Sequence, residues 1–378
     1  MLRRYVLVVL LHAYIGVRIL PALHAWSPAW LVTLAWLLVS AVVMPLGFAA
    51  RRVRRQPLSD RIAWVGLVAM GSFSSLFVLT LVRDVALIVS RVLPAAWFDA
   101  ATAAAFTHAS SLGVPVLAAV MTLVGFINAR RRARVRRVDV PIEGLPASLD
   151  GFTIAQISDL HVGPTIKRRY VDAVVEAVNA IGADLIAVTG DLVDGGVAQL
   201  RGHTEPLRRL SSRYGTYFVT GNHEYYSGVQ PWLAELRRLG FRVLLNEHVV
   251  LRHRDAKLVL AGVTDYSAHH YHATHRSDPA AALAGAPSDA ALRVLLAHQP
   301  ASAFDASRAG FDLQLSGHTH GGQFVPWNWF VRFWQPFTAG LHRLGRLWVY
   351  VSRGTGYWGP PKRLGAPSEI TRLRLVAA

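Results

Sequence analysis

Hydrophobic and polar positions divide the chain into two parts that meet near residue 129. Before that point lie four long apolar stretches with almost no polar positions, as in WLVTLAWLLVSAVVMPLGFAA. The helices of a soluble bundle would each keep a polar face, so the pattern favours membrane-spanning helices over four buried helices. The predicted spans are 5–20, 30–50, 62–82 and 103–129.

The second part has a different pattern, in which short apolar runs alternate with amphipathic segments. VDVPIEGL alternates like an edge strand, whereas YVDAVVEAVNAIG and PWLAELRRLG have helical spacing. This alternation predicts a layered α/β fold. We therefore expect an all-α transmembrane domain at 1–129, a basic juxtamembrane linker at 130–137 and a globular α/β domain at 138–378.

Charge and composition narrow the function classes. The formal net charge is +17, nearly all from arginine, and the chain has no cysteine. Disulfides, thiolate catalysis and thiolate metal ligands are therefore excluded. Because the dense arginine runs flank apolar stretches, they suit the ends of membrane helices, and we expect no nucleic-acid partner.

The loop arginines predict the orientation of the spans. Residues 20–29 and 94–99 contain no lysine or arginine, whereas residues 51–61 contain five arginines and residues 130–137 contain six. By the positive-inside rule the N-terminus and everything after residue 129 are cytoplasmic. One span fewer would reverse the side on which the second domain lies.

Five apolar runs of the second part end in residues that can bind metals. The runs are TIAQISDLH, ADLIAVTGDLVDG, GTYFVTGNHE, LRVLLAHQP and FDLQLSGHTHGG. Taken alone, an aspartate after a strand is more often a helix cap, and GN or GD pairs are common turns. Ligands of open α/β sheets bind outside the carboxyl ends of the strands, and here five strands would deliver ligand types to that edge. Together the five runs favour a metal site.

The order of these motifs is D-x-H, G-D-x-x-D, G-N-H-E, H and G-H-x-H-G-G-Q. It resembles the calcineurin-like metallophosphoesterase superfamily over about residues 138–378. More narrowly it is similar to the bacterial, membrane-anchored phosphodiesterase-like branch, with relatives that hydrolyse UDP-2,3-diacylglucosamine in lipid A biosynthesis. The closing run YVSRGTGYWGPPKRLGAPSEITRLRL also resembles that branch. The resemblance implies a layered β-sandwich flanked by helices and a location in the bacterial inner (plasma) membrane.

The resemblance also implies a binuclear metal centre, in which Asp191 bridges two divalent cations. An all-oxygen and nitrogen donor set suits Mn²⁺, with Fe²⁺ and Zn²⁺ as alternatives, better than Mg²⁺. The nucleophile would be a metal-bridging hydroxide. One metal would take Asp159, His161 and His320, and the other would take Asn222, His298 and His318.

Catalysis beyond the metals is expected from His223, which by resemblance contacts the phosphate and helps to protonate the leaving oxygen. Glu224 is the carboxylate expected to orient His223. Asp194 either supports a ligand or caps the loop that follows it. Five glycines are expected to let the backbone approach the metals and the phosphate closely: Gly190, Gly221, Gly317, Gly321 and Gly322.

Two further stretches bear on the substrate. In FVPWNWFVRFWQPF, residues 324–337, seven of 14 positions are aromatic. This stretch is either a packed corner of the core or a surface for the membrane interface or an acyl chain. The histidines of SAHHYHATHR match no motif of the family, so an ordinary loop is favoured over an extra metal site. The candidate substrate or lipid contacts are Trp327, Trp329, Phe330 and Trp334.

The sequence thus predicts a membrane-anchored, metal-dependent phosphoesterase that hydrolyses a phosphodiester or pyrophosphate. A lipid-linked substrate of the UDP-2,3-diacylglucosamine type is the leading class, with membrane lipids as partners. The alternatives are a tethered phosphoprotein or nucleotide phosphatase, and a catalytically weak membrane scaffold. The natural substrate, the metal and the oligomeric state are left open.

Overall fold

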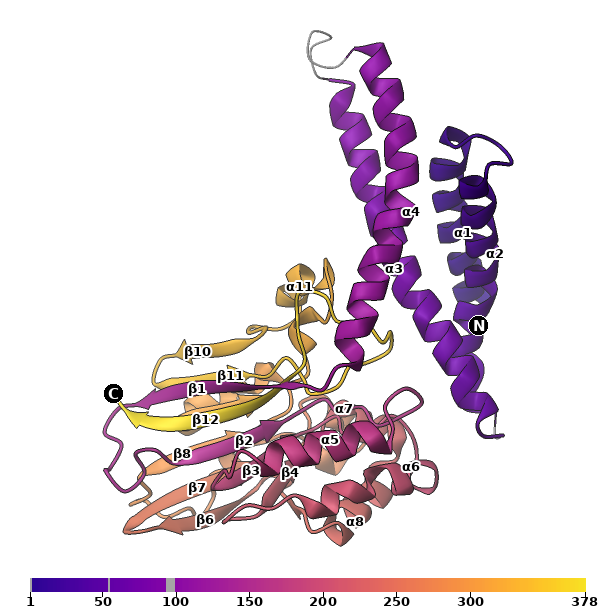
Figure 1. The fold of residues 1–378 in the computed structure, drawn as a ribbon. Coiled ribbons are helices and arrows are strands. Elements are labelled where there is room, and N and C mark those ends of the chain that lie inside the picture. The colour runs from indigo at the N-terminus through magenta and orange to yellow at the C-terminus, as the bar shows by residue number, and fades with distance from the viewer. Residues whose placement is uncertain (1, 54, 93–98) are drawn as a thin grey trace. The chain divides into compact units, whose positions relative to one another are not determined.

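The computed structural model describes residues 2–53, 55–92 and 99–378, which form two compact units (Figure 1). The first unit extends to Asn128 and also includes the short segment Gly359–Lys362. The second unit comprises Ala129–Trp358 and Arg363–Ala378. The change of unit after Asn128 falls next to the boundary expected at residue 129.

The first unit is built from four long helices that match the four predicted spans. Each is long and apolar enough to cross a membrane. The third is longer than predicted and continues through Arg83, whereas most of the loop expected at 94–99 lies outside the described residues. The helices are α1 (Leu2–Ile19), α2 (Pro28–Ala49), α3 (Leu58–Ser90) and α4 (Ala100–Arg130), with 3₁₀ turns η1 (Leu20–Ala22) and η2 (Ala50–Arg52).

A polar cluster links α1 and α3 within this apolar unit. The Tyr14 hydroxyl donates to Asp84 at 2.6 Å, and the Arg18 guanidinium contacts both oxygens of the same carboxylate, the closest at 2.8 Å. The buried Arg83 donates instead to two serines of α4, Ser110 and Ser111. Charges can lie in these helices because a partner of opposite charge or a hydroxyl replaces the lost water.

Helices α2 and α3 approach each other most closely at two glycines. A Cβ atom added to Gly66 would lie 2.4 Å from the Cα of Gly47, and one added to Gly47 would lie 2.8 Å from the Cα of Gly66. Both neighbours are backbone atoms, which cannot move without separating the helices. Small residues at such a contact let two apolar helices pack by close van der Waals contact, as in other membrane proteins.

The second unit contains two six-stranded sheets (Figure 1). The first has the order β1 (Arg134–Ile142), β12 (Glu369–Ala377), β2 (Thr153–Ile157), β3 (Leu185–Thr189), β4 (Thr216–Val219) and β5 (Arg242–Val243). The second has the order β10 (Gly340–Leu344), β11 (Leu347–Val351), β9 (Leu313–Ser316), β8 (Leu292–Leu296), β7 (Ala256–Gly262) and β6 (Glu247–His253).

Buried side chains divide this unit into layers. Alternate residues of each strand face opposite sides, so Ile154 of β2 packs between the two sheets while Ala155 packs under the helices. The predicted layered α/β fold is therefore confirmed. Helices α5 (Arg168–Asn179), α6 (Val197–Thr204) and α8 (Val229–Arg238) cover the first sheet; α9 (Pro279–Leu283) and α10 (Ala303–Ala309) cover the second.

The expected linker at 130–137 differs from the structure. Helix α4 includes Arg130, and strand β1 begins at Arg134 and pairs in parallel with β12 at the edge of the first sheet. The arginine-rich run alternates like the rest of the edge strand, and Arg136 forms an ion pair with Glu369 at 3.5 Å. Residues 134–137 are therefore part of the sheet.

Parallel pairing places the strand ends of interest together. Strands β2, β3 and β4 pair in parallel in the first sheet, and β8 pairs in parallel with β9 in the second. The remaining short helical segments of this unit lie in the loops between its strands and helices: η3 (Glu205–Arg209), α7 (Asn222–Ser227), η4 (Ala268–His270), η5 (Ala273–His275), η6 (Pro300–Ser302), η7 (His320–Gly322), α11 (Trp327–Phe330) and η8 (Val331–Phe333).

The glycine contact generates a test of helix packing. We expect Gly66→Ala to destabilise the chain by about 1–3 kcal/mol, because the new methyl group overlaps the backbone of α2. Gly113→Ala on α4 is the matched control, since its Cβ would meet nothing within 4 Å and alanine favours a helix. Thermal unfolding of the purified chain in detergent measures both. Equal melting temperatures for the two variants would contradict the assigned contact.

Candidate metal centre

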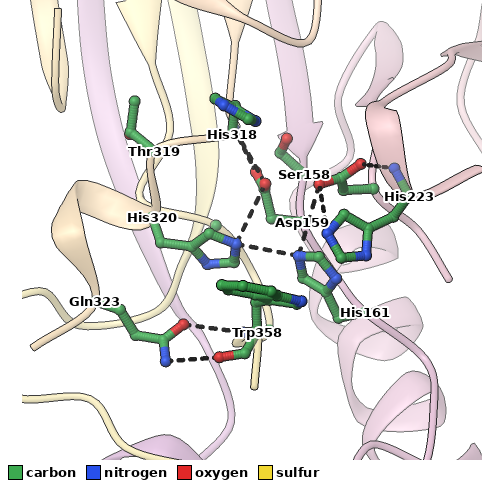
Figure 2. Close-up of polar contacts among 12 residues, drawn as sticks. Ser158, Asp159, His161, His223, His318, Thr319, His320, Gln323 and Trp358 are labelled. Atoms are coloured by element: carbon green, nitrogen blue, oxygen red, sulfur yellow. Dashed lines mark hydrogen bonds and ion pairs between the residues drawn. The ribbon is translucent and has the colours of Figure 1, made fainter. Parts of the chain in front are cut away.

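The five strand ends bring residues that can bind a metal close together, and Figure 2 shows Asp159, His161, His223, His318 and His320 among them. Their carboxylates and imidazoles fall into three groups, two of which share His161, and within each group the ligand atoms lie within 4.8 Å of one another. The groups are Asp159, His161 and His320; Asp191, His298 and His318; and His161, Asp194 and His223.

The first group joins the loop after β2 to the loop after β9. The Nε2 atoms of His161 and His320 face each other at 3.0 Å, and the His320 Nε2 lies 3.4 Å from an oxygen of Asp159. All three side chains are buried. The same carboxylate also accepts the backbone N–H of His318 at 3.0 Å, which ties the two loops together.

The second group centres on Asp191, which follows β3. Its Oδ2 atom lies 3.2 Å from the Nε2 of His298 and 3.9 Å from the Nε2 of His161, which belongs to the first group. His318 approaches the same His298 nitrogen at 3.2 Å through its Nδ1 atom. The Nδ1 of His298 faces the Thr189 carbonyl at 2.7 Å, so that contact orients the ring and leaves Nε2 toward the centre. Asp191 therefore lies between the two groups.

The third group places a carboxylate against the His223 ring, and that carboxylate is Asp194. Its Oδ1 atom contacts the His223 Nδ1, and its Oδ2 lies 3.2 Å from the Nδ1 of His161. The sequence predicts Glu224 in this position. It instead accepts the backbone N–H groups of Gly221 at 2.7 Å, Leu192 at 2.7 Å and Asp191 at 3.0 Å. Glu224 is not directed at His223 because both of its carboxylate oxygens accept backbone N–H groups in the turns that carry the predicted ligands.

Charge in the cluster is unevenly distributed. Burial lowers the pKa of His223, but the carboxylates of Asp191 and Asp194 outweigh it and raise the pKa to about 9. Burial, together with the neighbouring His298, lowers the pKa of His318 to about 3. These shifts favour a protonated His223 and a neutral His318 at neutral pH, and a neutral imidazole is the form that binds a metal.

Backbone conformation distinguishes the predicted ligands from most of the chain. Five of them have a positive φ, a region that is costly for residues other than glycine and that clusters at functional sites. A positive φ is expected where a loop turns sharply, and here the sharp turns direct the side chains back toward the strand ends. These residues are Asp159 (53°), His161 (51°), Asp191 (53°), His318 (69°) and His320 (51°).

Comparison with known proteins agrees with this geometry. A profile of calcineurin-like phosphoesterases matches residues 152–322. A "Transmembrane protein with metallophosphoesterase domain" of Bos taurus is 44% identical over 270 residues, covering 68% of this chain and 61% of that protein. An "Uncharacterized metallophosphoesterase" of Campylobacter jejuni is 35% identical over 269 residues, covering 70% and 69%. One of Bacillus subtilis is 31% identical over 244 residues, covering 61% and 81%.

The chain belongs to the calcineurin-like metallophosphoesterases. Its metallophosphoesterase relatives include vertebrate as well as bacterial proteins, so the resemblance is not limited to the bacterial branch. The chain spans 61% and 62% of the length of its relatives from Bos taurus and Danio rerio.

The donor set fits the divalent metals that a metallophosphoesterase requires. The Oδ1 atom of Asn222 is buried and has no hydrogen-bond partner among the described residues, which is costly unless a cation takes that place. Two pairs of imidazole nitrogens also approach within 3.2 Å, as ligands of a shared ion do. Oxygen and nitrogen donors of this kind hold Mn²⁺, Fe²⁺ or Zn²⁺.

Arg363 is a supporting residue that the motif analysis missed. Its side chain is buried, and it donates to the His320 carbonyl at 2.9 Å while its Nη2 atom lies 3.0 Å from the His320 Nδ1. This contact orients the ring that carries one predicted ligand atom. The only signal was its place in the closing run YVSRGTGYWGPPKRLG, where no spacing ties it to the histidine.

The middle of the aromatic stretch is an exposed surface, whereas Phe324 is buried and Phe337 packs against the core. The stretch includes α11 and η8, and Trp329 is 60% exposed while Phe333 and Trp334 are each 71% exposed. Trp327 and Phe330 are also exposed. The histidine-rich loop lies in η4 and η5, and none of its histidines joins a metal-ligating group among the described residues.

Five glycines are expected to let the backbone approach the centre closely, and three of them lie directly against the predicted ligands or their loops. A Cβ at Gly221 would lie 2.2 Å from an Asp191 oxygen, and one at Gly317 would lie 2.2 Å from an Asp159 oxygen. Gly190 approaches Gly221 and His298. Gly321 instead faces the side chain of Arg353, and Gly322 faces the backbone of Asn328.

The crowding at Gly221 generates a test of metal binding. We expect Gly221→Ala to weaken Mn²⁺ binding by at least about tenfold, because the methyl group displaces the Asp191 carboxylate. Calorimetric titration of the purified chain with Mn²⁺ measures the affinity. Gly202→Ala in α6 is the control, since its Cβ would meet nothing within 4 Å. Unchanged affinity in the Gly221 variant would remove Asp191 from the metal centre.

Proposed function

We propose that the protein is a membrane-anchored phosphoesterase that uses two divalent metals to hydrolyse a phosphodiester or pyrophosphate. The position of Asp191 carries this proposal. One of its oxygens lies within 3.2 Å of His298 and within 3.9 Å of His161, so it is the group through which two metals would be joined. Asp159 and His320 would complete one site, and Asn222 and His318 the other.

The chain supplies binding, orientation and a proton around these metals. When bound, the pair of cations would neutralise phosphate charge and lower the pKa of a water molecule. His223, which lies against Asp191 and Asp194, is the group that would donate a proton to the leaving oxygen. Asp194 holds the ring through Nδ1, and Nε2 lies 3.9 Å from the Asp191 carboxylate, so this nitrogen faces the proposed metal centre. Glu224 maintains the turns that carry Asp191.

Asp191 provides the direct test. We expect Asp191→Ala to lower Mn²⁺-dependent hydrolysis of bis-p-nitrophenyl phosphate by at least about 100-fold, because several kcal/mol of charge stabilisation are lost with the metals. The measurement is the initial rate with saturating Mn²⁺, together with a thermal melt to show that the chain is folded. Asp255→Ala, at an exposed turn, is the matched control. Near-normal hydrolysis by the Asp191 variant would contradict the proposal.

We further propose that the substrate is lipid-linked, with UDP-2,3-diacylglucosamine as the type. Four apolar helices anchor the chain, and the exposed aromatic stretch begins four residues after His320. Tryptophan favours the boundary between lipid and water, where an acyl chain leaves the bilayer. The arginines of residues 51–61 and 130–137 support a cytoplasmic catalytic domain at a bacterial inner membrane. Mn²⁺ is the proposed metal.

The aromatic surface tests this substrate class. We expect the triple variant Trp329→Ser, Phe333→Ser, Trp334→Ser to lower kcat/KM at least about tenfold for UDP-2,3-diacylglucosamine in mixed micelles, because apolar contact with the acyl chains is lost. Hydrolysis of bis-p-nitrophenyl phosphate should stay within about twofold of the wild type.

Phe304→Ser on α10 is the matched control, since that ring is exposed but lies outside the aromatic stretch. Equal losses on the lipid and the soluble substrate would assign the stretch to folding alone. No loss on the lipid substrate would remove it from substrate binding and leave soluble phosphoesters as the better substrate class.

A further inference from the structure

Three half-exposed aromatic side chains lie beside His223, and none belongs to the five ligand motifs, although Trp358 lies in the closing run that resembles the family. The Tyr226 ring lies 5.0 Å from the His223 ring, centroid to centroid, and the Trp358 ring lies 5.7 Å away at a steep angle of 76°. Tyr271 contacts Tyr226 edge-on at 5.4 Å. The three are 51–53% exposed, so each presents an open ring surface.

Local structure explains why these rings meet at this histidine. Tyr226 follows His223 by three residues on α7, and residues at that spacing share a helix face. Trp358 is held through its backbone: its N–H donates to the Gln323 side chain at 2.9 Å, and its carbonyl accepts from the same amide at 2.9 Å (Figure 2). Gln323 ends the GHTHGGQ motif, so the loop that carries His320 also fixes this indole.

The exposure of these rings indicates more than a packing role. Tyr225, next to Tyr226, is buried, and its hydroxyl contacts His275 at 2.9 Å. Tyr226, Tyr271 and Trp358 instead leave about half of their surface open next to a buried polar cluster. Apolar surface left open beside a polar centre is typical of ligand sites, where few polar groups act among aromatic walls.

The position of His223 determines which part of a substrate these rings would meet. In the proposed function, on which this inference rests, His223 donates its proton to the leaving oxygen. The organic group on that oxygen must then lie within contact distance of the rings that flank His223. We propose that Tyr226, Tyr271 and Trp358 form a leaving-group subsite that takes a planar ring, such as an aryl group or a nucleobase.

The chemistry of the subsite favours a planar ring over an alkyl chain. Aromatic faces and edges attract other rings in offset or edge-to-face arrangements, and bases stack on such side chains regardless of their identity. The hydroxyl groups of Tyr226 and Tyr271 can form hydrogen bonds with a polar ring such as a nucleobase, whereas a hydrocarbon chain has no group to bond with them. The exposed stretch at Trp327–Phe330 and Val331–Phe333 offers a separate surface for an acyl chain. The two surfaces together suit a phosphoester with one planar and one lipid substituent.

A set of phosphonates can test the subsite without turnover. Methylphosphonate, phenylphosphonate and cyclohexylphosphonate share one anionic group and differ only in the substituent. Each is titrated calorimetrically into the full chain, loaded with Mn²⁺ and held in lipid nanodiscs, as the wild type and as Trp358→Leu and Tyr226→Leu. Phe304→Leu is the matched control, at an exposed ring on α10.

We expect the wild type to bind phenylphosphonate more tightly than cyclohexylphosphonate. Each leucine variant should weaken phenylphosphonate about tenfold, because leucine keeps apolar bulk but has no ring face. Methylphosphonate should stay within about twofold in all proteins, and Phe304→Leu should match the wild type throughout.

Each contrary outcome has a distinct meaning. Equal weakening of all three phosphonates would show that the rings only position His223, and would overturn the subsite. Equal weakening of the phenyl and cyclohexyl compounds would overturn its preference for planar groups. Failure of methylphosphonate to bind the Mn²⁺-loaded wild type would instead contradict the proposed function, because that ligand needs only the metal centre.

Discussion

The contact on which the catalytic unit depends is the buried carboxylate of Asp191, held between imidazoles of two strand-end groups. Its Oδ2 atom faces both His298 and His161, while its backbone N–H donates to Glu224. A buried carboxylate is costly without compensating positive charge or hydrogen bonds. The surrounding histidines, the braced turn and the crowded Gly221 all maintain this one position, so the proposed chemistry depends on it.

The two sheets explain how such distant residues can share a site. Strands β2, β3 and β4 place their carboxyl ends together, and β8 and β9 add theirs from the second sheet. A strand pair sets its neighbours about 5 Å apart, which is close enough for side chains on adjacent loops to meet. The loops then turn back through strained backbone to aim their ligands inward. Rigid strands and short strained loops together give a preorganised centre.

Two groups of exposed aromatic residues are connected to the loop that carries His318 and His320. The exposed stretch in α11 and η8 follows the last ligand loop, and Trp358 is held by the glutamine that ends the same loop. One loop therefore carries two predicted ligands, leads directly into the aromatic stretch and holds Trp358 through Gln323. In the proposed function, this loop would connect the metal centre to the surfaces that contact the substrate.

The sequence by itself determined the element pattern and the donor types. Apolar length predicted the four spans, alternation predicted the α/β layers, and the five motifs named every residue of the three metal-ligating groups. Tertiary structure alone decided the pairings. In the structure, Asp194 and not Glu224 contacts the His223 ring, and Arg363 contacts His320. Strand β1 includes most of the arginine run, and much of the aromatic stretch is exposed. The physical reason is that residue type and periodicity follow from local chemistry, whereas a contact between side chains depends on how separate loops turn in space.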